Sequence, residues 1–312
     1  MDPLAAVRTS TAWVVDQAKH VTINDAAINA AAKHLSAQSV PSVVWNSDDM
    51  HYSDGGPLTV QYLFLLDALN FCFWPDSEFD YVHLAKGLKA SLEKDKACLD
   101  ADKLAACDGL MLRKLVQWKT ELPGEEERAR LVREVGTGLL SSFEGQAANL
   151  VRAANNSAAQ LVTLVTAHFP GFRDHCVYRG RQVFLYKRAQ IFVGDVWGAF
   201  EGRGLGSFND IEALTMFADY LVPVVLREWK ILDYDQVLAT RVKEKEEIEP
   251  GSAEEVEIRA ATILAVERLR ESVAKQIKQE VLSLQIDWWL WQYGEDNRSR
   301  LEPHHRTRTI YY

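Results

Sequence analysis

Cysteine is scarce in this chain, and its cysteines are not placed as a metal site or a disulfide framework would require. They form no CxxC pair and show no ligand spacing to a histidine: Cys72, Cys98, Cys107 and Cys176. The adjacent pair His304-His305 is by itself a poor metal ligand set. We therefore expect a reducing compartment, no metal and no cofactor.

Long hydrophobic runs and long basic runs are both absent. The apolar stretches fall well short of the roughly 20 residues that a membrane-spanning helix needs, and the first eight residues lack the basic-then-apolar order of a signal peptide. The formal net charge is −9, whereas proteins that grip long DNA or RNA use clustered lysines and arginines. We expect a cytoplasmic protein with neither a membrane partner nor a polymeric nucleic-acid partner. A mononucleotide remains compatible with this charge.

The signature motifs of several protein classes are missing. No HExxH, GxSxG or EF-hand loop occurs, so zinc proteases, α/β-hydrolases and calcium sensors have no support. No repeat of roughly 20–50 residues is visible, which excludes solenoids and propellers. The glycine-rich segment 202–206 follows a helical pattern and lacks both the full GxGxxG and a Walker lysine. A connecting loop is therefore favoured there over a nucleotide cradle.

Apolar residues at helical spacing are present through most of the chain. Residues 60–73 are apolar on nearly every side, which is typical of a central helix. Asn24 is a candidate N-cap before an alanine-rich run, and two long helices are predicted over about 253–278 and 281–293. The fold class that this pattern predicts is mainly α.

One hairpin signal interrupts the helical pattern. Residues 176–178 and 182–185 flank Arg179-Gly180 and predict two short antiparallel strands. We therefore predict a single helical domain over residues 1–312 with one small β-hairpin. Subdomains of about 1–150 and 151–312 remain an alternative division.

Lys187 begins a stripe that is unusual for a surface helix. In a helix starting at this point, Lys187, Ile191, Gly194 and Gly198 share one face. The two glycines would allow another backbone or a ligand to approach closely. The alternative is a solvent-facing lysine beside a close helix crossing, and the spacing does not decide between the two.

Asp219 lies inside an apolar and aromatic run, 214–220, in a helix that we expect to begin near Ile211 and to be interrupted or followed by Pro223. Burial of an unpaired carboxylate costs several kcal/mol. Asp219 therefore has either a partner or a function. A structural salt bridge or a helix cap is the alternative to a catalytic role.

Two polar residues share a face of the apolar segment 62–74. Asp67 and Asn70 are spaced i, i+3, a pattern that presents hydrogen-bonding groups among aromatic rings such as Phe71 and Trp74. This arrangement suits a purine-like base, although satisfied core polar residues would give the same pattern. His51 precedes the segment on a predicted loop, where its imidazole could reach a phosphate or a hydroxyl.

These segments together resemble the queuosine salvage protein family, the queuosine 5′-phosphate N-glycosylase/hydrolases. The resemblance covers nearly the whole chain and is weakest before Trp45 and in residues 78–150. Several separate motifs in the right order make it specific. They are the segments 62–74 (YLFLLDALNFCFW), 169–174 (FPGFRD), 186–191 (YKRAQI), 211–220 (IEALTMFADY), 256–259 (VEIR), 287–291 (DWWLW) and 308–312 (RTIYY).

The resemblance implies a helical fold similar to that of DNA glycosylases and release of the base queuine from queuosine 5′-monophosphate for tRNA modification. The family's essential lysine falls on Lys187, its catalytic aspartate on Asp219 and its loop histidine on His51. A carboxylate at Asp219 would stabilise an oxocarbenium-like sugar or orient water. Lys187 would keep it ionised.

Base and phosphate contacts follow as further expectations. Asp67 and Asn70 would recognise the guanine-like edge, with Phe71 or Trp74 stacking on the base. Tyr220 neighbours the catalytic aspartate and is a further candidate for substrate binding. The 5′-phosphate needs cations, and Arg306 and Arg308 would supply them if the C-terminus folds back.

Three rival functions stay open. The first is a non-catalytic queuine- or nucleoside-binding protein with the same pocket. The second is a glycosylase acting on polymeric nucleic acid, which the acidic charge disfavours. The third is a scaffold protein, if the tryptophans at 288–291 form an exposed patch. We expect a monomer acting on a small molecule.

Overall fold

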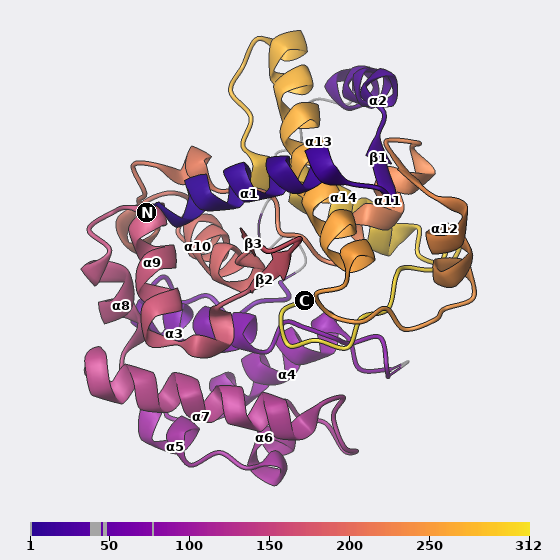
Figure 1. The fold of residues 1–312 in the computed structure, drawn as a ribbon. Helices are drawn as coiled ribbons and strands as arrows, with labels where there is room; N and C mark the ends of the chain where they lie inside the picture. Colours follow the sequence, from indigo (N-terminus) through magenta and orange to yellow (C-terminus); the bar gives the residue numbers. More distant parts are fainter. Residues whose placement is uncertain (1, 38–44, 46–48, 77) are drawn as a thin grey trace.

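The computed structural model describes residues 2–37, 45, 49–76 and 78–312, and in these ranges the chain is mainly α-helical (Figure 1). This confirms the predicted fold class. The α-helices are α1 (Pro3–Gln17), α2 (Asp25–Ala37), α3 (Pro57–Ala68), α4 (Tyr81–Lys94), α5 (Ala101–Ala105), α6 (Gly109–Leu115), α7 (Glu125–Ser142), α8 (Ala147–Ala153), α9 (Ala158–His168), α10 (Lys187–Ala199), α11 (Val222–Glu228), α12 (Gln236–Lys243), α13 (Ala253–Ile277) and α14 (Ser283–Asp296).

The predicted hairpin is present, and its turn explains its register. Strands β2 (His175–Tyr178) and β3 (Arg181–Phe184) pair antiparallel, with Tyr178 opposite Arg181. Arg179 and Gly180, the two turn residues, both have positive φ, 47° and 76°. Such a two-residue turn matches the twist of the strands. A second sheet, β1 (Val21–Ile23) with β4 (Leu232–Tyr234), was not predicted, because strands of three residues leave little periodicity to detect.

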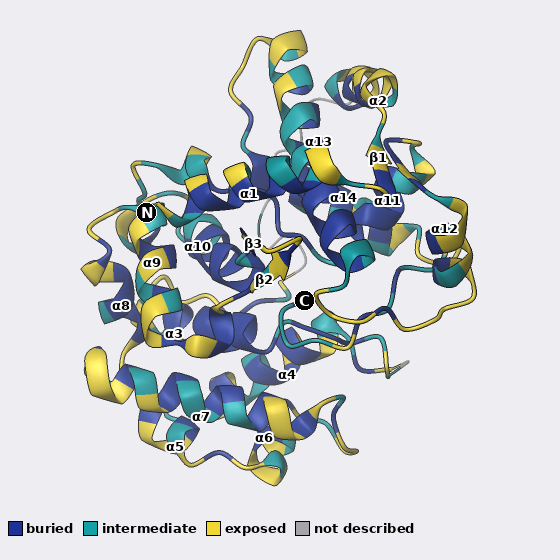
Figure 2. Ribbon diagram, in the orientation of Figure 1, coloured by how far each residue is buried: buried dark blue, intermediate teal, exposed yellow. Residues whose placement is uncertain are grey.

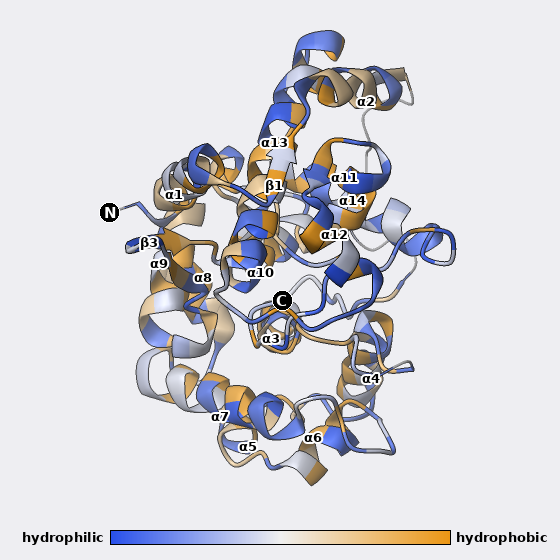
Figure 3. Cartoon of the chain, turned by 45° about the vertical axis from the view of Figure 1, so that its right-hand side comes forward, coloured by the Kyte–Doolittle hydropathy of each residue, from blue (hydrophilic) through white to orange (hydrophobic). Residues whose placement is uncertain are grey.

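Helix α3 is central, as its uniformly apolar sequence predicts. All its residues from Thr59 to Ala68 are buried, and this part of the helix is dark blue in Figure 2. The largest hydrophobic cluster surrounds it, and a second cluster lies between α2, α11, α13 and α14. Each cluster contains residues from before and after residue 150, since Leu4 belongs to the first and Val7 to the second, and both clusters also include residues of the C-terminal half. Apolar residues lie along the inner faces of these helices in Figure 3.

Two predicted helices are shorter than expected. The helix expected over 60–73 ends at Ala68, and the chain then turns sharply, with Cys72 at a φ of 45°. The helix expected from Ile211 is only a 3-10 turn, Ile211–Ala213, followed by extended chain. Helix α11 begins at Val222 and has Pro223 in its first turn, where a proline costs no hydrogen bond.

The C-terminal segment returns to the middle of the molecule, where both ribbon views place its end (Figures 1 and 3). The backbone N–H of Cys72 donates to the carbonyl oxygen of Tyr312 at 2.9 Å, which fixes this end beside the loop after α3. None of the helices in the described ranges is both long enough and apolar enough to cross a membrane.

Candidate active site

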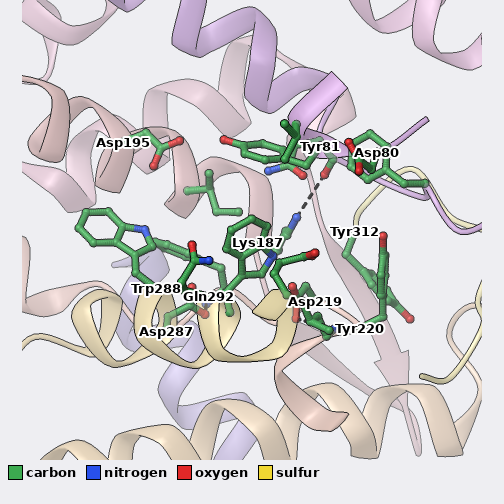
Figure 4. Close-up of a pocket in the computed structure, with 18 of the residues that line it drawn as sticks. Asp80, Tyr81, Lys187, Asp195, Asp219, Tyr220, Asp287, Trp288, Gln292 and Tyr312 are labelled. Atoms are coloured by element: carbon green, nitrogen blue, oxygen red, sulfur yellow. Dashed lines mark hydrogen bonds between the residues drawn. The ribbon is translucent and has the colours of Figure 1, made fainter. Parts of the chain in front are cut away.

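A cavity of about 160 Å³ lies where α10, α14, the loop after α3 and the segment before α11 meet. This volume is similar to that of cavities that take up a benzene ring, about 150 Å³. Its wall combines aromatic rings with charged side chains, and Figure 4 shows Lys187 near the centre with Asp195 on one side and Asp219 on the other. The mixture of aromatic rings and charged groups suits a ring-containing polar ligand.

Lys187 is the first residue of α10 and is only 4% exposed. Its backbone N–H donates to Oδ2 of Asp174 at 3.0 Å, which fixes the start of the helix. Its Nζ donates to the carbonyl oxygen of Asn70 at 3.2 Å. Burial lowers the pKa of Lys187 to about 8, while the charge of Asp219 acts in the opposite direction. The alternative of a solvent-facing lysine is thereby excluded.

Asp219 lies in the extended segment before α11 and lines the cavity. Its Oδ1 accepts the backbone N–H groups of Leu221 at 3.0 Å and Val222 at 2.9 Å. Asp219 thus caps the start of α11, which was one alternative to a catalytic role. It also faces the cavity. Burial raises its pKa, and Lys187 is the strongest influence that lowers it again. Lys187 therefore favours the ionised form of Asp219.

A buried ion pair holds both residues in place. Arg259 of α13 donates to both carboxylate oxygens of Asp174, at 2.9 and 2.6 Å, and its Nε donates to the carbonyl oxygen of Ala218 at 3.1 Å. Asp174 receives the N–H of Lys187, while Ala218 precedes Asp219. One guanidinium therefore connects the backbone beside both candidate catalytic residues. Two of the family-like motifs, 169–174 and 256–259, supply the pair.

Two further carboxyl groups face the cavity from α10 and α14. Asp195 is 4% exposed, and burial raises its pKa to about 7 although the indole N–H of Trp45 donates to its Oδ1 at 3.1 Å. Asp287 is 5% exposed and accepts the backbone N–H of Phe217 at 3.0 Å. Its pKa is raised well above the usual value, first by burial and then by the charge of Asp219.

Aromatic rings form the walls at this side of the cavity. The ring of Trp45 stacks on His51 with centroids 4.6 Å apart. The glycine stripe on α10 makes room for these rings, since a Cβ on Gly198 would lie 2.7 Å from Cγ of Trp45 and one on Gly194 would lie 2.9 Å from Cζ of Phe217. Aromatic side chains therefore occupy the space at the two glycines, where another backbone or a ligand was expected.

Charged and hydroxyl-bearing side chains surround the opposite side. Arg298 is exposed and donates to Glu295 at 2.6 Å. Tyr220 lies against His304, with ring centroids 4.5 Å apart, and the buried C-terminal Tyr312 also lines the cavity. Tyr220, Tyr312 and Asp219 are on the same side of Lys187 in Figure 4.

Six of the sequence-predicted site residues are brought together in this cavity. Its lining includes the two catalytic candidates and four of the substrate-binding candidates: Lys187, Asp219, His51, Asn70, Phe71 and Tyr220. Burial lowers the pKa of His51 to about 4, so its imidazole is neutral at pH 7. Asn70 lies beyond the end of α3 and is half-buried.

The other four predicted residues do not line the cavity. Asp67 is completely buried within α3 and is not part of the cavity lining. The C-terminal segment does fold back, but Arg306 and Arg308 lie over the ring of Trp74, at 5.2 and 5.1 Å, outside the lining. Arg308 also pairs with Glu247 at 2.8 Å. We therefore no longer assign these four residues to substrate contact.

Sequence reasoning missed several lining residues. Asp195 follows Ile191 by four residues and so continues the stripe that Lys187 begins. The motif 287–291 was noticed without a role, yet its helix presents Asp287, Trp288 and Trp291 to the cavity. These tryptophans are half-buried and packed on neighbouring rings, so they form no exposed patch. Arg298 carried no signal, and Tyr312 ends the motif 308–312 but was given no role.

Comparison with known proteins identifies the family of the chain. The model of the queuosine salvage protein family matches residues 50–312. A protein of Dictyostelium discoideum, named queuosine 5′-phosphate N-glycosylase/hydrolase, is 47% identical over the full length of both chains. Proteins with the same name from Sphaerobacter thermophilus and Bos taurus are 42% and 31% identical over at least 97% of each chain. The chain belongs to the queuosine salvage protein family.

Proposed function

We propose that this protein hydrolyses the N-glycosidic bond of queuosine 5′-monophosphate and releases queuine for salvage into tRNA. The observation that carries the proposal is the Asp219 carboxyl group, which two backbone N–H groups hold at the cavity and whose ionised form the buried Lys187 favours. The names of the three relatives support the substrate and the reaction.

The sugar lies against Asp219. Departure of the base leaves positive charge on C1′ and the ring oxygen of the ribose, and a carboxylate in a dry site stabilises such a charge strongly. Both N–H groups bind Oδ1. Oδ2 makes no hydrogen bond within the described residues and can face the sugar and accept the proton of the attacking water. Lys187 favours the ionised form of Asp219 and reaches the ribose hydroxyls.

The base lies at the aromatic side of the cavity. Phe217, Tyr81 and Trp288 provide ring surfaces for stacking. Asp287 and Gln292 of α14 both line the cavity, where they can bind the donors of the guanine-like edge. The neutral imidazole of His51 borders the same region. This assignment replaces Asp67, while Asn70 and Phe71 remain at the floor of the cavity.

The 5′-phosphate lies at the exposed side. Arg298 is the one arginine in the cavity lining among the described residues, and it is held there by Glu295. An exposed guanidinium can turn from a carboxylate to a phosphate and bind it with two parallel hydrogen bonds. The hydroxyl groups of Tyr220 and Tyr312 lie on the same side.

The proposal extends to a cytoplasmic monomer that acts on a small molecule and not on polymeric nucleic acid. All four cysteines, which lie within the described ranges, are free thiols, as in most proteins of reducing compartments. The net charge of −9 opposes binding to a polyanion. Sedimentation velocity measures the oligomeric state, and a filter-binding assay with tRNA tests the exclusion of polymers.

The test is chromatographic detection of free queuine after incubation with queuosine 5′-monophosphate. The wild type should release queuine, and Asp219→Asn should lower kcat by at least about 10³-fold because the stabilising charge is lost. Asp233→Asn is the matched control, since Asp233 is exposed on β4 and should tolerate the change. If the wild type binds queuosine 5′-monophosphate in calorimetry but releases nothing in a single turnover, the protein is a carrier and the proposal is wrong.

A further inference from the structure

Asp195 is a buried carboxyl group in the cavity wall for which the mechanism above has no use. It lies two helical turns after Lys187 on the same face of α10 and is 4% exposed. The indole N–H of Trp45 donates to Oδ1 at 3.1 Å, and Oδ2 makes no hydrogen bond within the described residues. In Figure 4 its carboxyl group lies across the cavity from Asp287 and Trp288, at the side assigned to the base.

The surroundings of Asp195 favour a neutral carboxyl group. Asp67 from α3 is completely buried, and its carboxyl oxygens make no hydrogen bond of ordinary geometry, although Asn70 lies close enough to lower its pKa. Lys187 is the charged group that lowers the pKa of Asp195, and burial outweighs it, so the pKa is about 7. The titratable groups around Asp195 are Asp67 and Tyr62 from α3, Tyr81 from α4, His51 from the loop before α3, Lys187 from α10 and Asp287 from α14.

Asp67 and Asp195 do not ionise together. The charge of Asp195 raises the pKa of Asp67, which burial already raises well above its usual value. Two like charges in a dry site are unfavourable, so ionisation of one carboxyl group of the pair opposes ionisation of the other. Asp195 is thus a carboxyl group that can carry a proton at the cavity wall and lose it near neutral pH, which is what a general acid requires.

We propose that Asp195 is the catalytic acid that protonates the departing base, a role that rests on the proposed function. The base of queuosine is a 7-deazapurine and has carbon in place of N7, so the usual site for protonating a purine leaving group is absent. The ring carbonyl oxygen and N3 are the acceptors that remain, and a protonated carboxyl group at the base side can reach one of them.

The proton and electron balance of this step closes. The C1′–N9 bond breaks and its electron pair leaves with the base, which takes the proton of Asp195. A water oxygen forms the new bond to C1′, and Asp219 accepts the proton that this water loses. Proton transfer from Asp219 to Asp195 through solvent then restores the starting state. One water is consumed, and the products are queuine and ribose 5-phosphate.

The experiment compares two leaving groups in Asp195→Asn. Queuosine 5′-monophosphate needs a proton on its base, whereas 4-nitrophenyl β-ribofuranoside 5′-phosphate has a leaving group that departs as a stable anion. Asparagine keeps the size of the side chain but cannot supply a proton. We expect kcat for queuosine 5′-monophosphate to fall by about 10²–10⁴-fold and kcat for the nitrophenyl substrate to stay within about threefold of the wild type.

The outcomes separate the two proposals. Equal losses of kcat on both substrates would mean that Asp195 is structural and would refute its role as the acid. Equal activity of Asp195→Asn and wild type on queuosine 5′-monophosphate would refute it as well, while leaving the proposed function intact. A wild type that releases no queuine refutes the proposed function and this inference with it.

A second variant keeps the inference testable if Asp195→Asn does not fold. In the wild type, kcat should fall as the pH rises through about 7, because the acid is then lost. Trp45→Phe removes a hydrogen bond that favours ionised Asp195, so this fall should move upward by about one pH unit. If the fall of kcat at high pH occurs at the same pH in Trp45→Phe as in the wild type, the assignment of Asp195 as the acid is overturned.

Discussion

The ion pair between Arg259 and Asp174 should dominate the stability of the region around the site. Both side chains are 3% exposed, and their two hydrogen bonds measure 2.9 and 2.6 Å. Loss of one partner leaves an uncompensated buried charge, which costs about 3–5 kcal/mol. Arg259→Met removes one guanidinium that pairs with Asp174, pairs with Glu255 at 3.6 Å and donates a hydrogen bond to the carbonyl oxygen of Ala218. We expect a loss of about 5 kcal/mol in the free energy of unfolding.

Asp174→Asn should be less damaging, because Arg259 keeps Glu255 and the carbonyl oxygen of Ala218. A loss of about 3 kcal/mol is expected. Arg268→Met is the matched control: it makes the same substitution on the same helix, α13, but Arg268 is 40% exposed and pairs with the exposed Asp25. Its loss should be below about 1 kcal/mol.

Urea denaturation followed by circular dichroism gives the three free energies at one pH and salt concentration. The expected order of destabilisation is Arg259→Met, then Asp174→Asn, then Arg268→Met. An Arg259→Met variant no less stable than Arg268→Met would refute the claim that a buried, doubly bonded guanidinium holds this part of the fold. A reversed order of the first two would refute the compensating role of Glu255.

Three further predictions concern the cavity. Burial raises the pKa of Asp195 from 3.8 to about 7, so between these pH values the folded chain holds a proton that the unfolded chain has released. The contribution of Asp195 to the free energy of unfolding is therefore lost as the pH rises from about 4 to 7. Urea titrations at pH 5 and pH 8 should show this fall in the wild type and not in Asp195→Asn. Gly194→Ala should raise KM by about tenfold, because the new Cβ would lie 2.9 Å from Cζ of Phe217 and displace that ring into the cavity, as steady-state kinetics will measure. Arg298→Gln should lower kcat/KM for queuosine 5′-monophosphate by at least about tenfold and leave the nucleoside unaffected, and equal effects on both would contradict a phosphate contact.

Local pattern was sufficient for much of the fold. The hairpin, the two long C-terminal helices and the buried α3 all follow from periodicity and turn residues that act within a few positions. The ends of helices were less predictable where a side chain from a distant part of the sequence binds the backbone groups at the helix end. The apolar pattern of α3 continues to Phe73, but Arg128 and Arg188 bind the carbonyl oxygens of Ala68, Leu69, Phe71 and Cys72 and so replace the next turn of helix.

In the site, too, some residues could be predicted from the local sequence and others could not. Lys187 and Asp219 stand out because each is a charged residue in an apolar context, and the family resemblance gave them roles. Arg306 and Arg308 were chosen because a phosphate needs cations, yet packing on Trp74 takes them outside the cavity lining. Arg298 lies on an exposed turn after α14 with no pattern around it. Only the three-dimensional arrangement brings it to the cavity.

Buried arginines explain how a site made largely of loops can be precise. Arg128 and Arg188 hold the loop that carries Asn70 and Phe71, and Arg259 holds the segment that carries Asp219. Each guanidinium replaces the missing ladder of a helix with several fixed donors, which a lysine with a single charged nitrogen cannot do. Arg128→Lys should therefore raise KM through a loosened loop even if the charge is kept. A catalytic carboxylate works only when its position is set before the substrate arrives, so these side chains, remote from the reacting bond, are part of what makes Asp219 effective.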